Sequence, residues 1–160
     1  MSSSPPTRRK YVSLVAFVGV CFAVAASGAF FPPDDWYRSL NRPSYAPPNW
    51  VFGPVWTILY LMIAVSGWLV WSAQSERSNR PAMIVFAIQL ALNAVWSALF
   101  FGLHSPGWAL FEICLLWAAI LSTMVSFSSH SRLAARLLLP YFGWVSFAAF
   151  LNYGFWSLNS

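Results

Sequence analysis

Charged side chains are scarce in this chain: Asp, Glu, Lys and Arg make up 8% of its 160 residues, and four of them are acidic. A soluble domain carries about 25% charged residues, so the composition excludes a water-soluble globular protein. It also excludes a disordered chain, because hydrophobic residues reach 59% and the mean hydropathy is +0.60. The sequence therefore predicts a protein embedded in a membrane.

Residues that hold metals or carry acid–base chemistry are few and scattered. Cys21 and Cys114 both lie inside apolar runs, where they are expected to be small core residues and not a disulfide or a metal pair. His104 and His130 lie at the ends of apolar segments on opposite sides, so neither is placed to form a metal site or to be an axial haem ligand inside a bundle. Glu112 is the single carboxylate within an apolar segment, which excludes a carboxylate pair there. It is either a functional intramembrane charge or a hydrogen-bonded structural group. We expect no metal site and no obligatory cofactor.

The net charge of +5 is not organised as a nucleic-acid-binding surface. The basic residues form no stripe, and no nucleic-acid motif is present. In a membrane protein, such an excess of Lys and Arg sets the orientation. We therefore expect no nucleic-acid partner.

Apolar residues are abundant, and polar or proline-rich breaks divide them into five segments at residues 11–31, 50–72, 81–103, 107–127 and 133–157. Each reaches the roughly 20 residues needed to cross a bilayer, and none shows the alternating pattern of a barrel strand. We predict an all-α membrane protein in which residues 1–160 form a single domain, a bundle of five transmembrane helices. Pro140 is expected to break or kink the fifth helix. The first segment also resembles a cleaved signal peptide, but its apolar run exceeds the usual length of about 7–15 residues.

The basic residues outside the segments predict the orientation. One side holds Arg8, Arg9, Lys10, Arg77, Arg80, Arg132 and Arg136, whereas the other holds Arg38 and Arg42, offset by Asp34 and Asp35. The positive-inside rule then places the N-terminus in the cytoplasm and the C-terminus on the opposite side. The first loop shares the side of the C-terminus.

That first loop, about residues 32–49, contains five prolines (Pro32, Pro33, Pro43, Pro47 and Pro48) and, with Trp50 just after it, the aromatic residues Trp36, Tyr37 and Tyr45. Prolines reduce the entropy lost on ordering, and aromatic side chains give a loop surface to bury. The loop is either an interfacial aromatic anchor or an ordered lid over the bundle. We favour the lid, because anchoring alone does not require five prolines.

Polar and aromatic residues gather in the half of the bundle beneath this loop. Gln89, Asn93 and Trp96 share one face of the third segment by their spacing. On the fifth segment, Pro140, Trp144, Ala148 and Asn152 recur every four residues. Polar groups in a membrane usually face the bundle interior or a cavity. A single Trp is explained by lipid anchoring or core packing, but Trp56, Trp96 and Trp144 together favour a site for a planar apolar ligand.

The opposite face of the third segment carries a stripe of small residues: Ala87, Ala91, Ala94, Ala98 and Gly102. Small residues allow transmembrane helices to approach closely. The stripe either packs within the same bundle or forms the seam of a homodimer. We predict the homodimer.

Several spaced motifs resemble the translocator protein family, also called the tryptophan-rich sensory proteins or peripheral benzodiazepine receptors. The resemblance spans roughly residues 20–156. It is carried by Trp36-Tyr37, Leu40, Pro43, Pro47-Pro48 and Trp50; by Gly53 to Thr57 with Leu59-Tyr60; by Gln89 to Asn93 with Trp96 and Phe100 to Gly102; and by Pro140-Tyr141, Trp144, Phe147-Ala148, Leu151 to Tyr153 and Trp156.

The resemblance implies a five-helix membrane protein that binds porphyrins, cholesterol-like lipids and benzodiazepine-site drugs in a cavity closed by the first loop. Its drug-contacting positions would fall on Trp50, Trp56, Asn93, Trp108, Trp144, Ala148 and Leu151. It also implies homodimers and, for some bacterial members, porphyrin turnover in which Trp56 and Trp144 would be the catalytic candidates. The animal cholesterol motif requires a basic residue after the tyrosine matched by Tyr153, and residues 154–160 contain none.

We therefore expect a binding protein for porphyrin-like tetrapyrroles, with porphyrin or haem as ligand, that acts in their transport, sensing or disposal. To the contacts above we add Trp96 and Asn152 from their spacing. The alternatives are an enzyme that degrades protoporphyrin by Trp-dependent photo-oxidation, and a sterol or lipid transporter. Membrane lipid is a further expected partner, and the first loop is typical of a bacterial membrane protein.

Overall fold

Five long helices form the bundle in the computed structural model, which describes residues 6–73 and 78–160, with side chains from Lys10 onward. The elements are α1 (Pro6–Ser27), a 3-10 turn (Gly28–Phe30), α2 (Asp35–Ser39), a 3-10 turn (Asn49–Val51), α3 (Phe52–Ser72), α4 (Arg80–Ser97), a π-helical turn (Ala98–Gly102), α5 (Pro106–Ser128), α6 (Arg132–Leu137) and α7 (Leu139–Asn159). Within the described residues no strand is present, and five helical spans are long and apolar enough to cross a membrane. The predicted fold class is confirmed.

Prolines determine where several helices begin. α4, α5 and α7 each carry a proline in the first turn, where its missing N–H costs no helical hydrogen bond. The fifth span is divided at Leu138 into α6 and α7. Pro140 explains this break, because its ring would collide with the carbonyl of Arg136 in a continuous helix.

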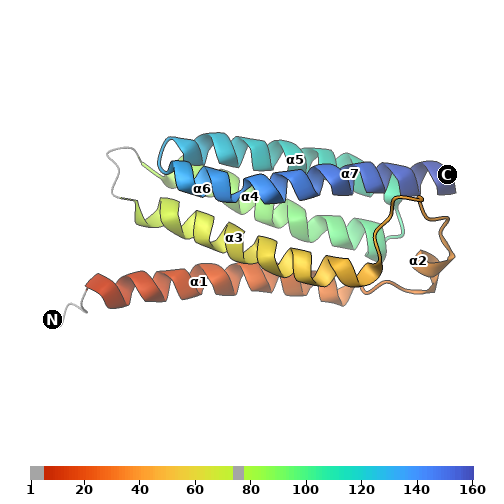
Figure 1. Ribbon diagram of the computed structural model, residues 1–160, viewed down its shortest axis with the longest axis horizontal. Coiled ribbons are helices and arrows are strands. Elements are labelled where there is room, and N and C mark those ends of the chain that lie inside the picture. Colours follow the sequence, from red (N-terminus) through yellow and green to blue (C-terminus); the bar gives the residue numbers. More distant parts are fainter. Residues whose placement is uncertain (1–5, 74–77) are drawn as a thin grey trace.

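The long helices run along the length of the bundle (Figure 1), and the contacts between them close into a ring. α1 packs against α3 and α4, α3 packs against α6, and α5 packs against α4, α6 and α7. Buried side chains from all five spans, among them Cys21, Ile63, Leu90, Ile120 and Tyr141, fill the centre of the ring. α3 and α7 make few direct contacts with each other.

One end of the bundle carries the first loop and the other does not (Figure 1). α1, α4 and α6 begin at one end, whereas α7 ends at the other, beside α2 and the loop that carries it. Residues 31–51, which we call the lid, include α2 and extend across this second end. One residue of the charge argument, Arg77, lies outside the described residues.

The orientation in the membrane gives a direct prediction. Five crossings place the two termini on opposite sides, and the basic residues at the α1 end favour the cytoplasm for Met1. A reporter fused at Ser160 should therefore be active in the compartment opposite to one fused at Met1. Reporters active on the same side would contradict a five-span topology.

Candidate functional site

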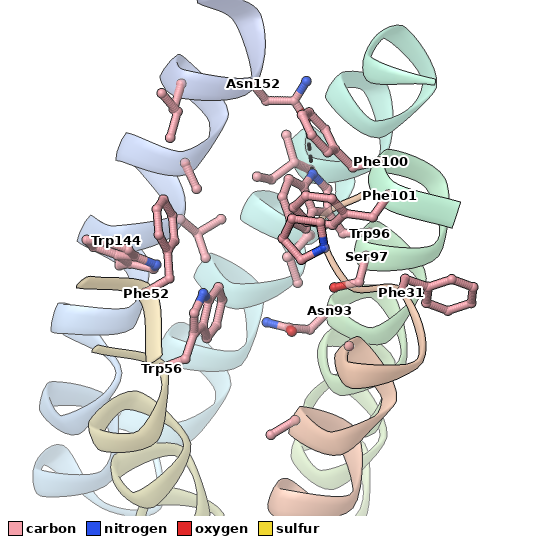
Figure 2. A pocket seen from close by; sticks show the side chains of 18 of the residues that line it. Phe31, Phe52, Trp56, Asn93, Trp96, Ser97, Phe100, Phe101, Trp144 and Asn152 are labelled. Carbon is pink, nitrogen blue, oxygen red and sulfur yellow. Dashed lines mark hydrogen bonds between the residues drawn. The ribbon is translucent and has the colours of Figure 1, made fainter. Parts of the chain in front are cut away.

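A cavity of about 430 Å³ lies beneath the lid, between α1, α3, α4, α5 and α7. This volume falls within the range of small-molecule sites, roughly 300–1,000 Å³. Seven of the nine predicted ligand-binding residues line it: Trp56, Asn93, Trp96, Trp144, Ala148, Leu151 and Asn152. Figure 2 shows Trp56 and Trp144 on one side of the space, with Asn93, Trp96 and Phe100 across from them.

The structure does not bring Trp50 and Trp108 to this cavity. Trp50 lies in the turn before α3 and is 75% exposed, and Trp108 at the start of α5 is 68% exposed. The inward face of α5 is formed by Ala109, Ile113 and Leu116, so Trp108 lies beside that face and not on it. Trp108 instead lines a shallow outer groove together with Phe111 and Trp156.

The aromatic walls are held by ring contacts, one within the α4 span and one between α3 and α7. The Trp96 ring stacks on Phe100 with centroids 5.2 Å apart. The ring of Phe52 meets Trp144 edge-on at 5.8 Å. Offset and edge-to-face pairs are the favoured geometries of aromatic side chains, and these contacts fix the rings that a planar ligand would meet.

Asn93 is the centre of a buried polar network. The hydroxyl of Tyr60 donates to Asn93 Oδ1 at 2.6 Å, and Asn93 Nδ2 donates to the hydroxyl of Tyr141 at 2.7 Å. The network joins α3, α4 and α7, and Tyr60 and Asn93 form part of the cavity wall. The residue spacing did not reveal Tyr60 and Tyr141 as site residues, although both belong to the motifs of the family resemblance.

Asn152 connects the Trp96 side of the cavity wall to the start of α5. Its Oδ1 accepts a hydrogen bond from Trp96 Nε1 at 3.0 Å, and its Nδ2 donates to the carbonyl of Pro106 at 2.8 Å. The Trp144 indole N–H is buried and has no hydrogen-bond partner among the described residues.

Two buried polar residues lie outside the cavity wall. Gln89 shares a helix face with Asn93 and is buried in the bundle interior, but it does not line the cavity. Gln89 and Glu112 are both buried, and their side-chain polar atoms have no hydrogen-bond partner within the described part of the chain. In the same part, no group of three or more His, Cys, Asp or Glu side chains is placed to hold a metal ion.

The predicted dimer stripe is partly accessible. Ala87 and Ala91 are exposed, whereas Ala94 and Ala98 are half-buried. Gly102 lies against the ring of Phe31, and a Cβ there would come within 2.7 Å of that ring. Gly102 therefore already serves close packing within its own chain.

The lid is fastened to the end of α7. The backbone N–H of Asn41 donates to Asn159 Oδ1 at 2.8 Å, and Asn159 Nδ2 donates back to the Asn41 carbonyl at 3.0 Å. Tyr45 stacks on Phe150 with centroids 4.6 Å apart. These contacts favour the ordered lid and argue against a loop that serves only as an interfacial anchor.

A second fastening joins the lid to the turn between α4 and α5. His104 Nε2 lies 2.9 Å from Asp34 Oδ2, and the His104 ring stacks on Trp36 with centroids 4.3 Å apart. Asp34 also caps α2 by accepting the N–H of Tyr37. The hydrogen bond from Tyr37 and the nearby His104 lower the pKa of Asp34 below its ordinary value.

This lowered pKa predicts an acid-sensitive lid. The closed lid favours ionised Asp34, so its contribution is complete above the ordinary pKa of about 3.9 and is lost as the pH falls through the lowered pKa. We expect ligand dissociation to accelerate as the pH falls below about 4. Asp34→Asn preserves the cap of α2 but removes the charge. Its dissociation rate, measured by stopped flow, should depend less on pH than that of the wild type; identical profiles would contradict the role of Asp34.

Comparison with known proteins gives consistent matches. Residues 17–157 match the TspO/MBR family. The chain is 40% identical to the tryptophan-rich protein TspO of Chlorobaculum tepidum, over 94% of this chain and 98% of that relative. It is 40% identical to the translocator protein of Homo sapiens over 78% of this chain and 75% of that protein. It is 37% identical to the tryptophan-rich sensory protein of Cereibacter sphaeroides over 91% and 90% of the two chains.

Proposed function

The chain belongs to the TspO/MBR family and is an integral membrane protein, and from this premise we propose that it binds porphyrin-like tetrapyrroles and benzodiazepine-site drugs. The binding serves tetrapyrrole transport, sensing or disposal. The names of two relatives, translocator protein and tryptophan-rich sensory protein, support transport or sensing.

The aromatic cavity carries this proposal. Trp56, Trp96 and Trp144 surround an apolar space, and none of the described side chains that line it is charged. Indole rings provide flat apolar surface for stacking, and a few fixed polar groups such as Asn93 orient a ligand. A planar, largely apolar molecule is the ligand class that matches this wall.

Parallel titrations of the purified protein test the proposal. Protoporphyrin, haem and cholesterol are added separately, and the quenching of tryptophan fluorescence or competition with labelled ligand is followed. We expect saturable binding of protoporphyrin and haem, and weaker binding of cholesterol, because no Lys or Arg follows Tyr153. Saturable binding of cholesterol without binding of either tetrapyrrole would favour the lipid-transport alternative.

Photo-oxidative degradation of protoporphyrin is a second candidate function. Its support is that Trp56 and Trp144 line the same cavity, so one bound ligand would meet both indoles. Illumination of the complex should then yield a product that is absent with the Trp56→Phe/Trp144→Phe double variant. Unchanged protoporphyrin after illumination of the wild type would leave ligand binding as the remaining candidate function.

We further propose that α4 forms a homodimer seam through Ala87 and Ala91. Both side chains are exposed on the surface of α4, where small residues allow close helix approach. Ala91→Leu should shift purified protein from dimer to monomer in sedimentation experiments and leave protoporphyrin affinity unchanged. Ala118→Leu, at an exposed position on α5, is the matched control. Loss of ligand binding with an intact dimer would mean that the Ala91 face of α4 contacts the ligand and does not form the dimer seam.

A further inference from the structure

The inner wall of the cavity offers no positive charge to a ligand. Its described polar side chains are neutral, and they include Asn93, Ser97 and Asn152. A buried carboxylate without a cationic partner is strongly disfavoured. A ligand that carries carboxylates must therefore place them outside this wall.

Arg42 lies directly outside the cavity, on the lid. Its Nη1 donates to Asn49 Oδ1 at 3.0 Å, and its guanidinium carbon lies 5.7 Å from the centroid of the Tyr37 ring. Asn49 and Tyr37 both line the cavity. The Arg42 guanidinium therefore contacts the outer side of two residues whose side chains line the cavity.

The positive charge of Arg42 is not neutralised within the described residues. Its second hydrogen bond goes from Nη2 to the carbonyl of Pro47 at 3.1 Å, so both of its acceptors are neutral. Among the described residues, Asp35 pairs with Arg38, and Asp34 contacts His104. A guanidinium has five N–H donors in a planar fork, and hydrogen bonds to Asn49 and Pro47 leave donors for a carboxylate.

We propose that Arg42 is the acid-binding residue of this site. The ligand would be an amphipathic acid whose planar apolar body fills the cavity between the tryptophans, and whose carboxylate reaches the Arg42 guanidinium at the lid. Arginine suits this role because its fork matches a carboxylate in a bidentate geometry. The inference rests on the proposed function and adds to it the chemical class of the ligand's polar edge.

Two other roles for Arg42 make different predictions. Arg42 bridges Asn49 and Pro47, so it also braces the lid, and a purely structural brace would affect all ligands alike. A lipid phosphate bound by Arg42 would likewise be indifferent to whether the cavity ligand is an acid or an ester. Comparing an acid with its ester therefore isolates the proposed contact.

The test combines two proteins with two ligands. Affinities of wild type and Arg42→Gln are measured for protoporphyrin, which carries two propionates, and for its dimethyl ester, in a neutral detergent at low salt. We expect Arg42→Gln to weaken the free acid about tenfold, equivalent to about 1.4 kcal/mol, and to change the ester by less than about twofold. Arg38→Gln is the matched control, because Arg38 is exposed and pairs with Asp35; it should change neither affinity.

Each outcome decides between the roles. Equal weakening of acid and ester in Arg42→Gln would assign a structural brace and overturn the proposal, and so would the absence of any change. Arg42→Lys, which retains the charge without the fork, should bind the acid with intermediate affinity. If wild-type protein binds neither the acid nor the ester, the proposed function itself fails. If the wild type binds both ligands, but the ratio of its affinities for acid and ester equals the ratio in Arg42→Gln, only the role of Arg42 fails.

Discussion

Replacing Ala148 with Leu should weaken protoporphyrin binding by about 5–150-fold, because overpacking a filled site costs about 1–3 kcal/mol. Ala148 lines the cavity on α7, one turn from Trp144 and one turn from Asn152. The larger side chain would occupy space beside the Trp144 ring. Membrane insertion should be unaffected, since Leu is at least as apolar as Ala. Equilibrium titration of the purified variant measures the effect.

The control for this substitution must add the same volume elsewhere. Ser66→Leu is unsuitable, because Ser66 is fully buried and its hydroxyl donates to the carbonyl of Ala134 at 2.8 Å. Ala118→Leu places the same side chain at an exposed position of α5 and should bind as the wild type does. Trp144→Ala should also weaken binding, because it removes an indole on which the ligand would stack. Wild-type affinity in both Ala148→Leu and Trp144→Ala would mean that the ligand site lies elsewhere.

Asn93→Leu should lower the free energy of unfolding by about 1–3 kcal/mol and disturb the cavity wall. The substitution leaves the buried hydroxyls of Tyr60 and Tyr141 without the partner that both contact. Leu has a similar size, so the loss would reflect hydrogen bonding more than packing. Unfolding in mixed detergent, followed by circular dichroism, measures the change.

A combined variant separates the network from simple loss of volume. Replacing all three polar partners with apolar groups is expected to be far less costly than orphaning two of them. Adding Tyr60→Phe and Tyr141→Phe to Asn93→Leu should therefore recover much of the lost stability. Additive losses across the three substitutions would show that the hydrogen bonds are not coupled.

The fold could be predicted from the sequence because a bilayer permits few backbone arrangements. The five apolar segments had the length of a membrane span, and Pro140 indicated where the fifth span breaks. The structure adds what composition does not encode, for example that the third span ends in a π-helical turn at Ala98–Gly102.

The site was less accessible from the sequence because spacing gives the face of a helix but not its rotation relative to its neighbours. Trp108 is one residue away from the buried Ala109, and this offset directs it to the outer groove. Tyr60 and Asn93 are 33 residues apart, and Asn93 and Tyr141 are 48 apart. No local pattern reports such a contact, so the polar network emerges only when α3, α4 and α7 are placed together.

An experimental structure of the protein with bound protoporphyrin tests the central proposal most directly. The porphyrin ring should lie beneath the lid, in the cavity between Trp56 and Trp144 on one side and Trp96 on the other. A ring bound instead in the outer groove beside Trp108 and Trp156, with the cavity unchanged, would contradict it.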